Sequence, residues 1–469
     1  MIPQTPQEWF TLLSERLRSR HIRLWAVERY VTGNAPLPEG ATEVKEAYQR
    51  WQTLARADYP SLVVDAPAER MNIAGFRVGD DATDNDSARA LWRRSLMESA
   101  SNDVTRDMLV FGVAYAMASP TVEGAVLTHE SPYTCIVDMD PLVPSRVRAG
   151  LKVWHDIGAD FAVLHLPGMI YYYERQATQR SNMIATPSGV LLPSAAQSGW
   201  RLVRSAESGI DVVPMVQFLN RGGVGEFELV TDLLDRINWV VLQRLLIIAM
   251  QAFRQRALVG ELPEKDPEGN VIDYEAMFTP GPDALWTLPD GVSIWESQPG
   301  DIQQILSAVK DDVRELSAVT RTPMSVLSPD SANQSAEGAS LMREGLVYKV
   351  EDRQRRMAPF WEALVSMGLT LDGKPAEVQV QWAPAERQSL SERFDALTKA
   401  GDLPWRDRMT DVLGYDAARV DQMEINRARD AEMAAKLAPP PPAVVEVPDG
   451  PDSEDPEDDI EDQGDVTAA

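Results

Sequence analysis

The hydrophobic pattern of the chain is strongest over residues 229–258, where apolar side chains recur every three or four positions. This spacing lines one face of an α-helix. Five bulky residues widen the apolar surface beyond a single stripe: Trp239, Leu242, Leu246, Ile247 and Met250. A helix this apolar must be covered on most sides, by its own chain or by neighbouring copies. We therefore expect these five residues to form an oligomer interface.

The same helix is long enough to be a strut of an assembly, about 45 Å at about 1.5 Å per residue. A membrane span would need about 20 consecutive residues without charge, and this run is interrupted by Asp232, Asp235, Arg236 and Arg244. We therefore expect no membrane insertion.

Two more helices are predicted downstream. Residues 301–321 place apolar side chains on one face of a helix and polar side chains, including Gln303 and Arg314, on the other. Residues 335–367 are predicted to form the next helix. Between the two, residues 322–334 hold two prolines and several side chains that bind nearby backbone groups, which predicts a loop. The proline-rich residues 258–298 exclude a continuous helix and predict a compact mixed subdomain.

The rest of the pattern mixes helices with short strands. Helices are predicted at residues 7–33, 42–57, 87–117, 389–400, 405–413 and 417–435. Strands are predicted at residues 72–78, 126–128, 133–138, 149–154, 161–165, 169–174, 200–203, 212–218 and 378–382. The predicted fold class is α+β, mainly α, with a β-rich insert before the long helix.

Composition narrows the functional classes. The 469 residues are 44% hydrophobic, so a core can form, and the single cysteine, Cys135, excludes an intrachain disulfide. The N-terminal residues lack the uninterrupted apolar segment of an export signal. The net charge is −27, and no basic cluster resembles the footprint of a sequence-specific DNA-binding protein. Residues 438–469 carry eleven acids and no Lys or Arg, which predicts a disordered tail.

No catalytic, cofactor or metal site emerges from the sequence. The histidines His21, His129, His155 and His165 are scattered and lack metal-ligand spacing. Glycines at 222–225 precede the long helix but match neither GxxxxGK[ST] nor GxGxxG, so a plain turn is favoured over a phosphate loop. An enzyme, such as a hydrolase, remains an alternative. A turnover or nucleotide-binding screen would distinguish it from a protein without catalytic activity.

Several segments resemble a known family. The residues are VPMVQFLNR at 213–221, GEFEL at 225–229, LLDRIN at 233–238, QSAEGASL at 334–341, WAP at 382–384 and GDLP at 401–404. Their order and spacing resemble the portal proteins of tailed bacteriophages, particularly siphophages of Gram-positive hosts, over roughly residues 5–436. Gly225 departs from the serine expected before Glu226.

The resemblance implies a division of the chain into named parts. These are a wing (1–228), a first stem helix (229–257), a clip (258–299), a second stem helix (300–321), a tunnel loop (322–335), a long helix and return strand of the wing (336–385), crown-like helices (386–437) and the acidic tail (438–469).

The resemblance also implies a ring of about twelve copies at one capsid vertex of the virion, made in the host cytoplasm. Double-stranded DNA would pass through the channel without sequence specificity during packaging and ejection. The other implied partners are the terminase large subunit, the head–tail adaptor, and capsid and scaffolding proteins. A different phage component, such as a minor capsid or connector protein, is the alternative.

We expect the channel to be lined by the second stem helix and the tunnel loop. The candidate DNA-facing residues are Gln303, Arg314, Thr322, Ser325, Ser328, Asp330, Ser331, Asn333 and Gln334. Only Asp330 is charged in the loop, and this suits sliding, because Lys or Arg there would make phosphate contacts that must break at every step.

Overall fold

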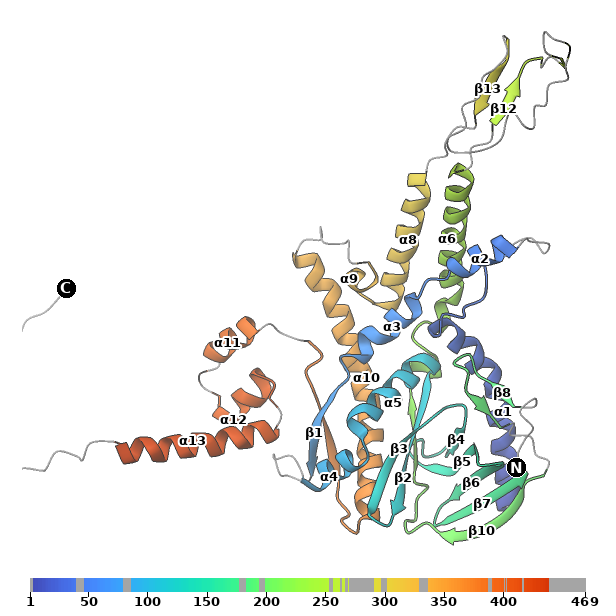
Figure 1. The fold of residues 1–469 in the computed structure, drawn as a ribbon. Helices are drawn as coiled ribbons and strands as arrows, with labels where there is room; N and C mark the ends of the chain where they lie inside the picture. Colours follow the sequence, from blue (N-terminus) through green and yellow to red (C-terminus); the bar gives the residue numbers. More distant parts are fainter. Residues whose placement is uncertain are drawn as a thin grey trace, which may run out of the picture. The chain divides into compact units, whose positions relative to one another are not determined.

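The structure is a computed structural model. It describes residues 3–38, 46–78, 86–176, 183–193, 199–252, 256–261, 264–265, 269, 291–296, 302–328, 336–386, 390–399, 401, 403–415 and 417–437. The predicted acidic tail and most of the predicted clip lie outside these residues. The elements confirm an α+β fold that is mainly α (Figure 1).

A five-stranded antiparallel sheet forms the centre of the β-rich region, in the order β10-β7-β6-β5-β4. Its strands are β4 (Cys135–Met139), β5 (Val147–Asp156), β6 (Ala159–Leu166), β7 (Met169–Gln176) and β10 (Arg201–Glu207). Helix α1 (Pro6–Val31) packs its N-terminal half on one face, where Phe10 and Leu13 meet Leu151 and Leu164 in a small core of their own.

A three-stranded sheet, in the order β11-β2-β3, packs on the opposite face. It consists of β2 (Val113–Thr121), β3 (Gly124–Glu130) and β11 (Met215–Leu219). Gly150 in β5 lies against Met215 of β11, since a Cβ on it would be 2.3 Å from the methionine sulfur and would displace that side chain. A short hairpin joins β8 (Ile184–Ala185) to β9 (Leu191–Leu192).

The main core lies where these strands meet the helices of the N-terminal half and α10. The elements are α3 (Tyr59–Ala68), α4 (Asp86–Arg94), α5 (Met97–Phe111), α10 (Ala336–Leu371), and β1 (Ile73–Val78) paired with β14 (Val378–Trp382). Helix α2 (Glu46–Leu54) precedes α3 in the chain. Trp361 of α10 is buried, meets the ring of Trp92 edge-on and packs at a tilt against Phe218. The long helix α10 continues through Pro359.

The long apolar helix predicted from the sequence is α6 (Thr231–Ala252), preceded by two short turns, η2 (Arg221–Gly223) and η3 (Glu228–Val230). It is followed by β12 (Arg256–Val259), which pairs with β13 (Ser293–Glu296). The chain then returns in α8 (Ile302–Thr320), which lies beside α6 (Figure 1).

Residues 390–437 contain α11 (Leu390–Lys399), α12 (Trp405–Asp407), the single π-helical turn η4 (Arg408–Val412) and α13 (Ala417–Leu437). Contacts divide the chain into two units, residues 1–417 and 418–469. The described part of the second unit is residues 418–437 of α13, a mostly exposed segment in which acidic and basic side chains are equal in number.

Two predicted helices differ from the structure. The helix expected over residues 87–117 is interrupted at Leu96, whose φ is +53°, and ends before Gly112, whose φ is +76°. Residues 113–117 belong to β2. The helix expected to reach residue 258 stops at Ala252, and the residues that follow pair as a strand. In the described part of the chain no helix has both the length and the low charge needed to cross a membrane.

Candidate functional site

The paired helices α6 and α8 share an apolar seam. The buried residues of this seam are Leu234, Ile237 and Leu242 on α6, and Val309, Val313 and Leu316 on α8. All but Leu242 belong to the main core cluster. On the outside of the pair, Arg236 reaches Asp312 at 3.0 Å and also contacts Glu315. Because Arg236 is half-exposed, we assign the pairing of the helices chiefly to the apolar seam.

The base of the pair is joined to α10 by a buried ion cluster. Glu226, just before η3 and α6, accepts from Lys349 at 2.8 Å and from Arg353 at 2.7 Å. Burial alone would raise the pKa of Glu226, but the two cations hold it below its ordinary value. Burial lowers the pKa of Lys349, and Glu226 opposes that shift.

Lys349 also closes the C-terminal end of α8. Its ammonium donates to the carbonyl of Thr320 at 3.0 Å, which satisfies one of the carbonyls left open at a helix end. Ser317 donates to the carbonyl of Thr322 at 2.6 Å, and Thr320 to the hydroxyl of Thr322 at 3.0 Å. The start of α6 and the end of α8 are therefore both fixed to α10.

The first residue of the predicted tunnel loop is consequently not available to a ligand. Thr322 is 1% exposed, so its predicted contact with DNA is wrong, because its hydroxyl is used inside the chain. The residues that follow form one helical turn, α9 (Met324–Leu327), on which Ser325 is exposed; Ser328 is half-buried. Four predicted residues lie outside the described part: Asp330, Ser331, Asn333 and Gln334.

The two candidate channel residues of α8 are both at the surface. Gln303 is exposed, and Arg314 is exposed with its guanidinium 2.7 Å from Asp311. They belong to a stripe on the side of α8 away from the seam, which also carries Gln304 and Lys310. The stripe is polar and mixes both signs of charge.

The residues of α6 that were predicted to form the oligomer interface differ in their exposure. Trp239 is 46% exposed, and Leu246 and Ile247 are half-buried. Leu242 is fully buried within the single chain, so its prediction as an interface residue is wrong. The side chain of Met250 lies outside the described part. Ile248 on α6 and Val319 on α8 are also exposed and apolar. They were not among the predicted interface residues, although their hydrophobicity could have indicated them.

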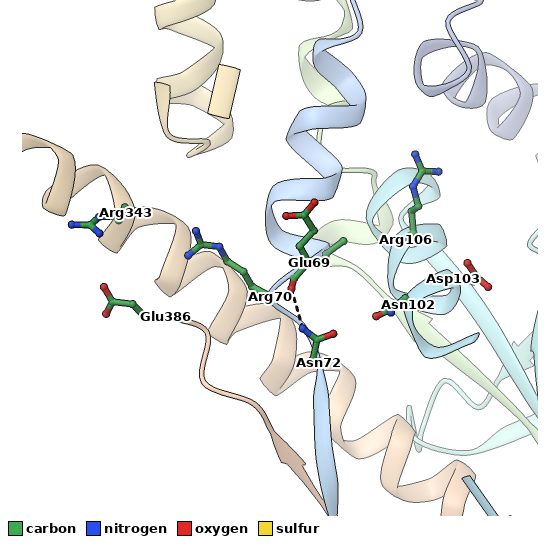
Figure 2. A pocket seen from close by; sticks show the side chains of 9 residues that line it. Glu69, Arg70, Asn72, Asn102, Asp103, Arg106, Arg343 and Glu386 are labelled. Carbon is green, nitrogen blue, oxygen red and sulfur yellow. Dashed lines mark hydrogen bonds between the residues drawn. The ribbon is translucent and has the colours of Figure 1, made fainter. Parts of the chain in front are cut away.

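A charged cleft of about 680 Å³ lies between α3, α5 and α10 (Figure 2). Arg70, Arg106 and Arg343 line it, together with the acids Glu69, Asp103 and Glu386. Arg106 is held 3.3 Å from Asp65. The charges balance, so the cleft favours no ion of one sign. Its residues come from distant segments, and for that reason sequence patterns could not find it.

The histidines do not gather into a metal site. His21 contacts the carbonyl of Tyr133, His129 lies 2.7 Å from Asp107, and His155 lies 2.8 Å from Asp160. Within the described ranges, no three His, Cys, Asp or Glu residues are grouped as metal ligands would be. These contacts indicate structural roles for the three histidines.

The chain matches the family described as "Phage portal protein, SPP1 Gp6-like" over residues 15–406. The portal protein of Mycobacterium phage D29 is 23% identical over 427 residues, which cover 82% of this chain and 81% of that protein. The portal protein of Mycobacterium phage L5 is 23% identical over 424 residues, covering 82% of this chain and 80% of the relative.

Two solved structures are similar over most of their length. One is titled "Neck of native GTA particle computed with C12 symmetry", with a TM-score of 0.44, 13% identity, and coverage of 83% of this chain and 92% of that one. The other is titled "Neck of empty GTA particle computed with C6 symmetry", with a TM-score of 0.46, 12% identity, and coverage of 83% and 93%.

Proposed function

We propose, given that the chain belongs to the SPP1 Gp6-like family of phage portal proteins, that its copies form a closed ring around an axial channel for double-stranded DNA. In this proposal α6 and α8 are the stem, the residues between them include the clip, and residues 322–335 form the tunnel loop. The ring occupies one capsid vertex of the virion. It would meet capsid and scaffolding proteins, the terminase large subunit during packaging, and the head–tail adaptor afterwards.

The observation that carries the proposal is the two-sided character of α8. One side is buried against α6, and the other is the exposed polar stripe with Gln303 and Arg314. Lys310 and Arg314 share this surface with Asp311 and Glu315, so the stripe has no excess of positive charge. Such a surface can border DNA without the net phosphate contacts that would have to break at each step.

The exposed apolar residues of the stem supply the contact between copies. Trp239, Ile248 and Val319 are exposed in one copy, and large apolar side chains at a surface mark protein interfaces when they gather on one element. Trp239 and Ile248 are nine residues apart and therefore lie on opposite sides of α6, so each can meet one of the two neighbours that a copy has in a ring. We therefore place the ring interface on the outer sides of α6 and α8.

Light scattering with negative-stain imaging tests the proposal. The wild-type protein should form rings at micromolar concentration, and Trp239→Glu should shift the mass toward the monomer with helix content unchanged. The matched control is Val122→Glu, in the turn between β2 and β3, where the valine is also exposed; it should assemble like wild type. A wild-type protein that stays monomeric in several buffers would refute the proposed ring.

A further inference from the structure

Helix α1 carries an exposed stripe that the stem does not account for. Arg18, Ile22, Trp25 and Arg29 follow one another at steps of four, three and four residues, so they lie along one line of the helix. Ile22 is 79% exposed and Trp25 is exposed too. The guanidinium of Arg29 lies 4.7 Å from the Trp25 ring. The stripe is an apolar centre between two arginines.

A second apolar surface is a groove of about 300 Å³ beside α10. Met139, Val213, Met215, Phe360 and Met367 line it. Two apolar residues are exposed at or near it: Val212 at the groove is half-exposed, and Leu142, in the turn between β4 and β5, is 89% exposed. Asp211 and Arg146 also line the groove, and Asp140 accepts from the backbone of Leu142 at 2.9 Å.

The stripe and the groove are on opposite sides of the five-stranded sheet. Leu151 in β5 points to α1 and packs in its core cluster. Gly150, the residue before it, faces Met215 of β11, because successive residues of a strand point to opposite faces. Met215 lines the groove, whereas Ile22 and Trp25 lie on the side of α1 that faces away from the chain's core.

We infer that the α1 stripe of one copy docks into this groove of the next copy, an inference that rests on the proposed ring. In a closed ring each copy meets its neighbours through two different surfaces, one on each side. The stripe and the groove are two such surfaces, both apolar at the centre. Arg18 and Arg29 flank the stripe, whereas the groove and the β4–β5 turn beside it carry two acids, Asp211 and Asp140, against one arginine, Arg146.

Trp25 is the anchor of this contact. Tryptophan and arginine are the residues that most often carry binding energy when they enter a pocket on a partner. The groove supplies the thioether and aromatic side chains that such a ring contacts well. The contact would bury Ile22 and Leu142, which are exposed in the single copy.

Paired cysteines test the contact. Ile22→Cys and Val212→Cys in one chain, joined by a short bifunctional maleimide, should give a ladder of covalent oligomers up to the full ring. Mixing the two single variants should give covalent dimers and no larger species. The native Cys135 is buried and does not interfere. The control pair is Ile22→Cys with Ile157→Cys, since Ile157 is exposed in a turn away from the groove; it should give no ladder.

The outcomes separate this inference from the proposed ring. Rings by light scattering with a ladder only for the 22/212 pair support both. Rings without that ladder, with both cysteines reactive toward a monofunctional maleimide in the dissociated chain, overturn the docking and leave the ring standing. The absence of any ring would overturn the proposed function, and the docking with it.

Discussion

Lys349 in α10 and Glu226 at the base of α6 form an ion pair of 2.8 Å in which both side chains are only 5% exposed. The same ammonium caps the end of α8. One lysine therefore fixes both the start of α6 and the end of α8 to α10. A change at this junction should affect the stem as a unit.

We predict that Glu226→Gln destabilises the chain by about 3–5 kcal/mol, because it leaves Lys349 buried without its carboxylate, while Arg353 keeps only its contact with Asp352. Urea and thermal unfolding measure the effect. The control is Arg314→Gln, which removes an exposed pair with Asp311 and should leave unfolding unchanged. Equal midpoints for the two variants would show that the buried cluster is not a structural junction.

Acidic pH should destabilise the sheet through His165. This residue lies in β6 on the face opposite α1, and burial first, then nearby Lys152, lowers its pKa to about 4. Between these two pKa values the unfolded chain binds a proton at this histidine and the folded chain does not. The free energy of unfolding therefore falls as the pH drops from about 6.5 to about 4, by about 3 kcal/mol in total.

The variant His165→Leu isolates this contribution. Thermal midpoints should be measured between pH 7 and pH 4, which covers the range between the pKa of the unfolded and of the folded chain. They should fall less steeply with pH for the variant than for wild type. The difference should vanish above the ordinary histidine pKa. Parallel curves for the two proteins would contradict a buried neutral His165.

A positive charge in the tunnel loop should slow DNA passage. Ser325→Lys adds a phosphate contact that must be broken repeatedly, so packaging should slow most at low salt and recover at higher salt. Ser205→Lys, at an exposed position of β10, is the matched control. Packaging rates equal to wild type at both salt concentrations, with rings intact, would remove this loop from the channel.

The acidic tail should be dispensable for folding and assembly. Its eleven acids repel one another, and its sequence has few apolar residues to drive folding. Truncation after Leu437 should leave circular dichroism and ring mass unchanged. Aggregation or loss of rings in the truncated protein would give the tail a structural role.

Local pattern predicted the helices well and their ends less well. The three-and-four spacing identified α6, but residues 256–259 pair with β13 instead of extending the helix, and a short apolar run fits either state. The apolar residues 113–117 were assigned to a helix although Gly112 precedes them; its positive φ ends α5. That glycine was the available signal.

The site was predictable only in outline. Helical period placed Gln303 and Arg314 on the polar side of α8, and they are exposed. Thr322 and Leu242 were misassigned because helical period and loop composition do not show which side chains the folded chain buries. The Glu226–Lys349–Arg353 cluster was missed for the same reason, since no pattern in sequence links residues that only the fold brings together.

Symmetric reconstruction of the purified full-length protein by electron cryo-microscopy tests the central claim most directly. The account predicts a closed ring with an axial channel, into which the polar stripe of α8, with Gln303 and Arg314, points from every copy. A ring whose channel is lined by another element, with this stripe on the outer surface, or a protein that never leaves the monomeric state, would contradict it.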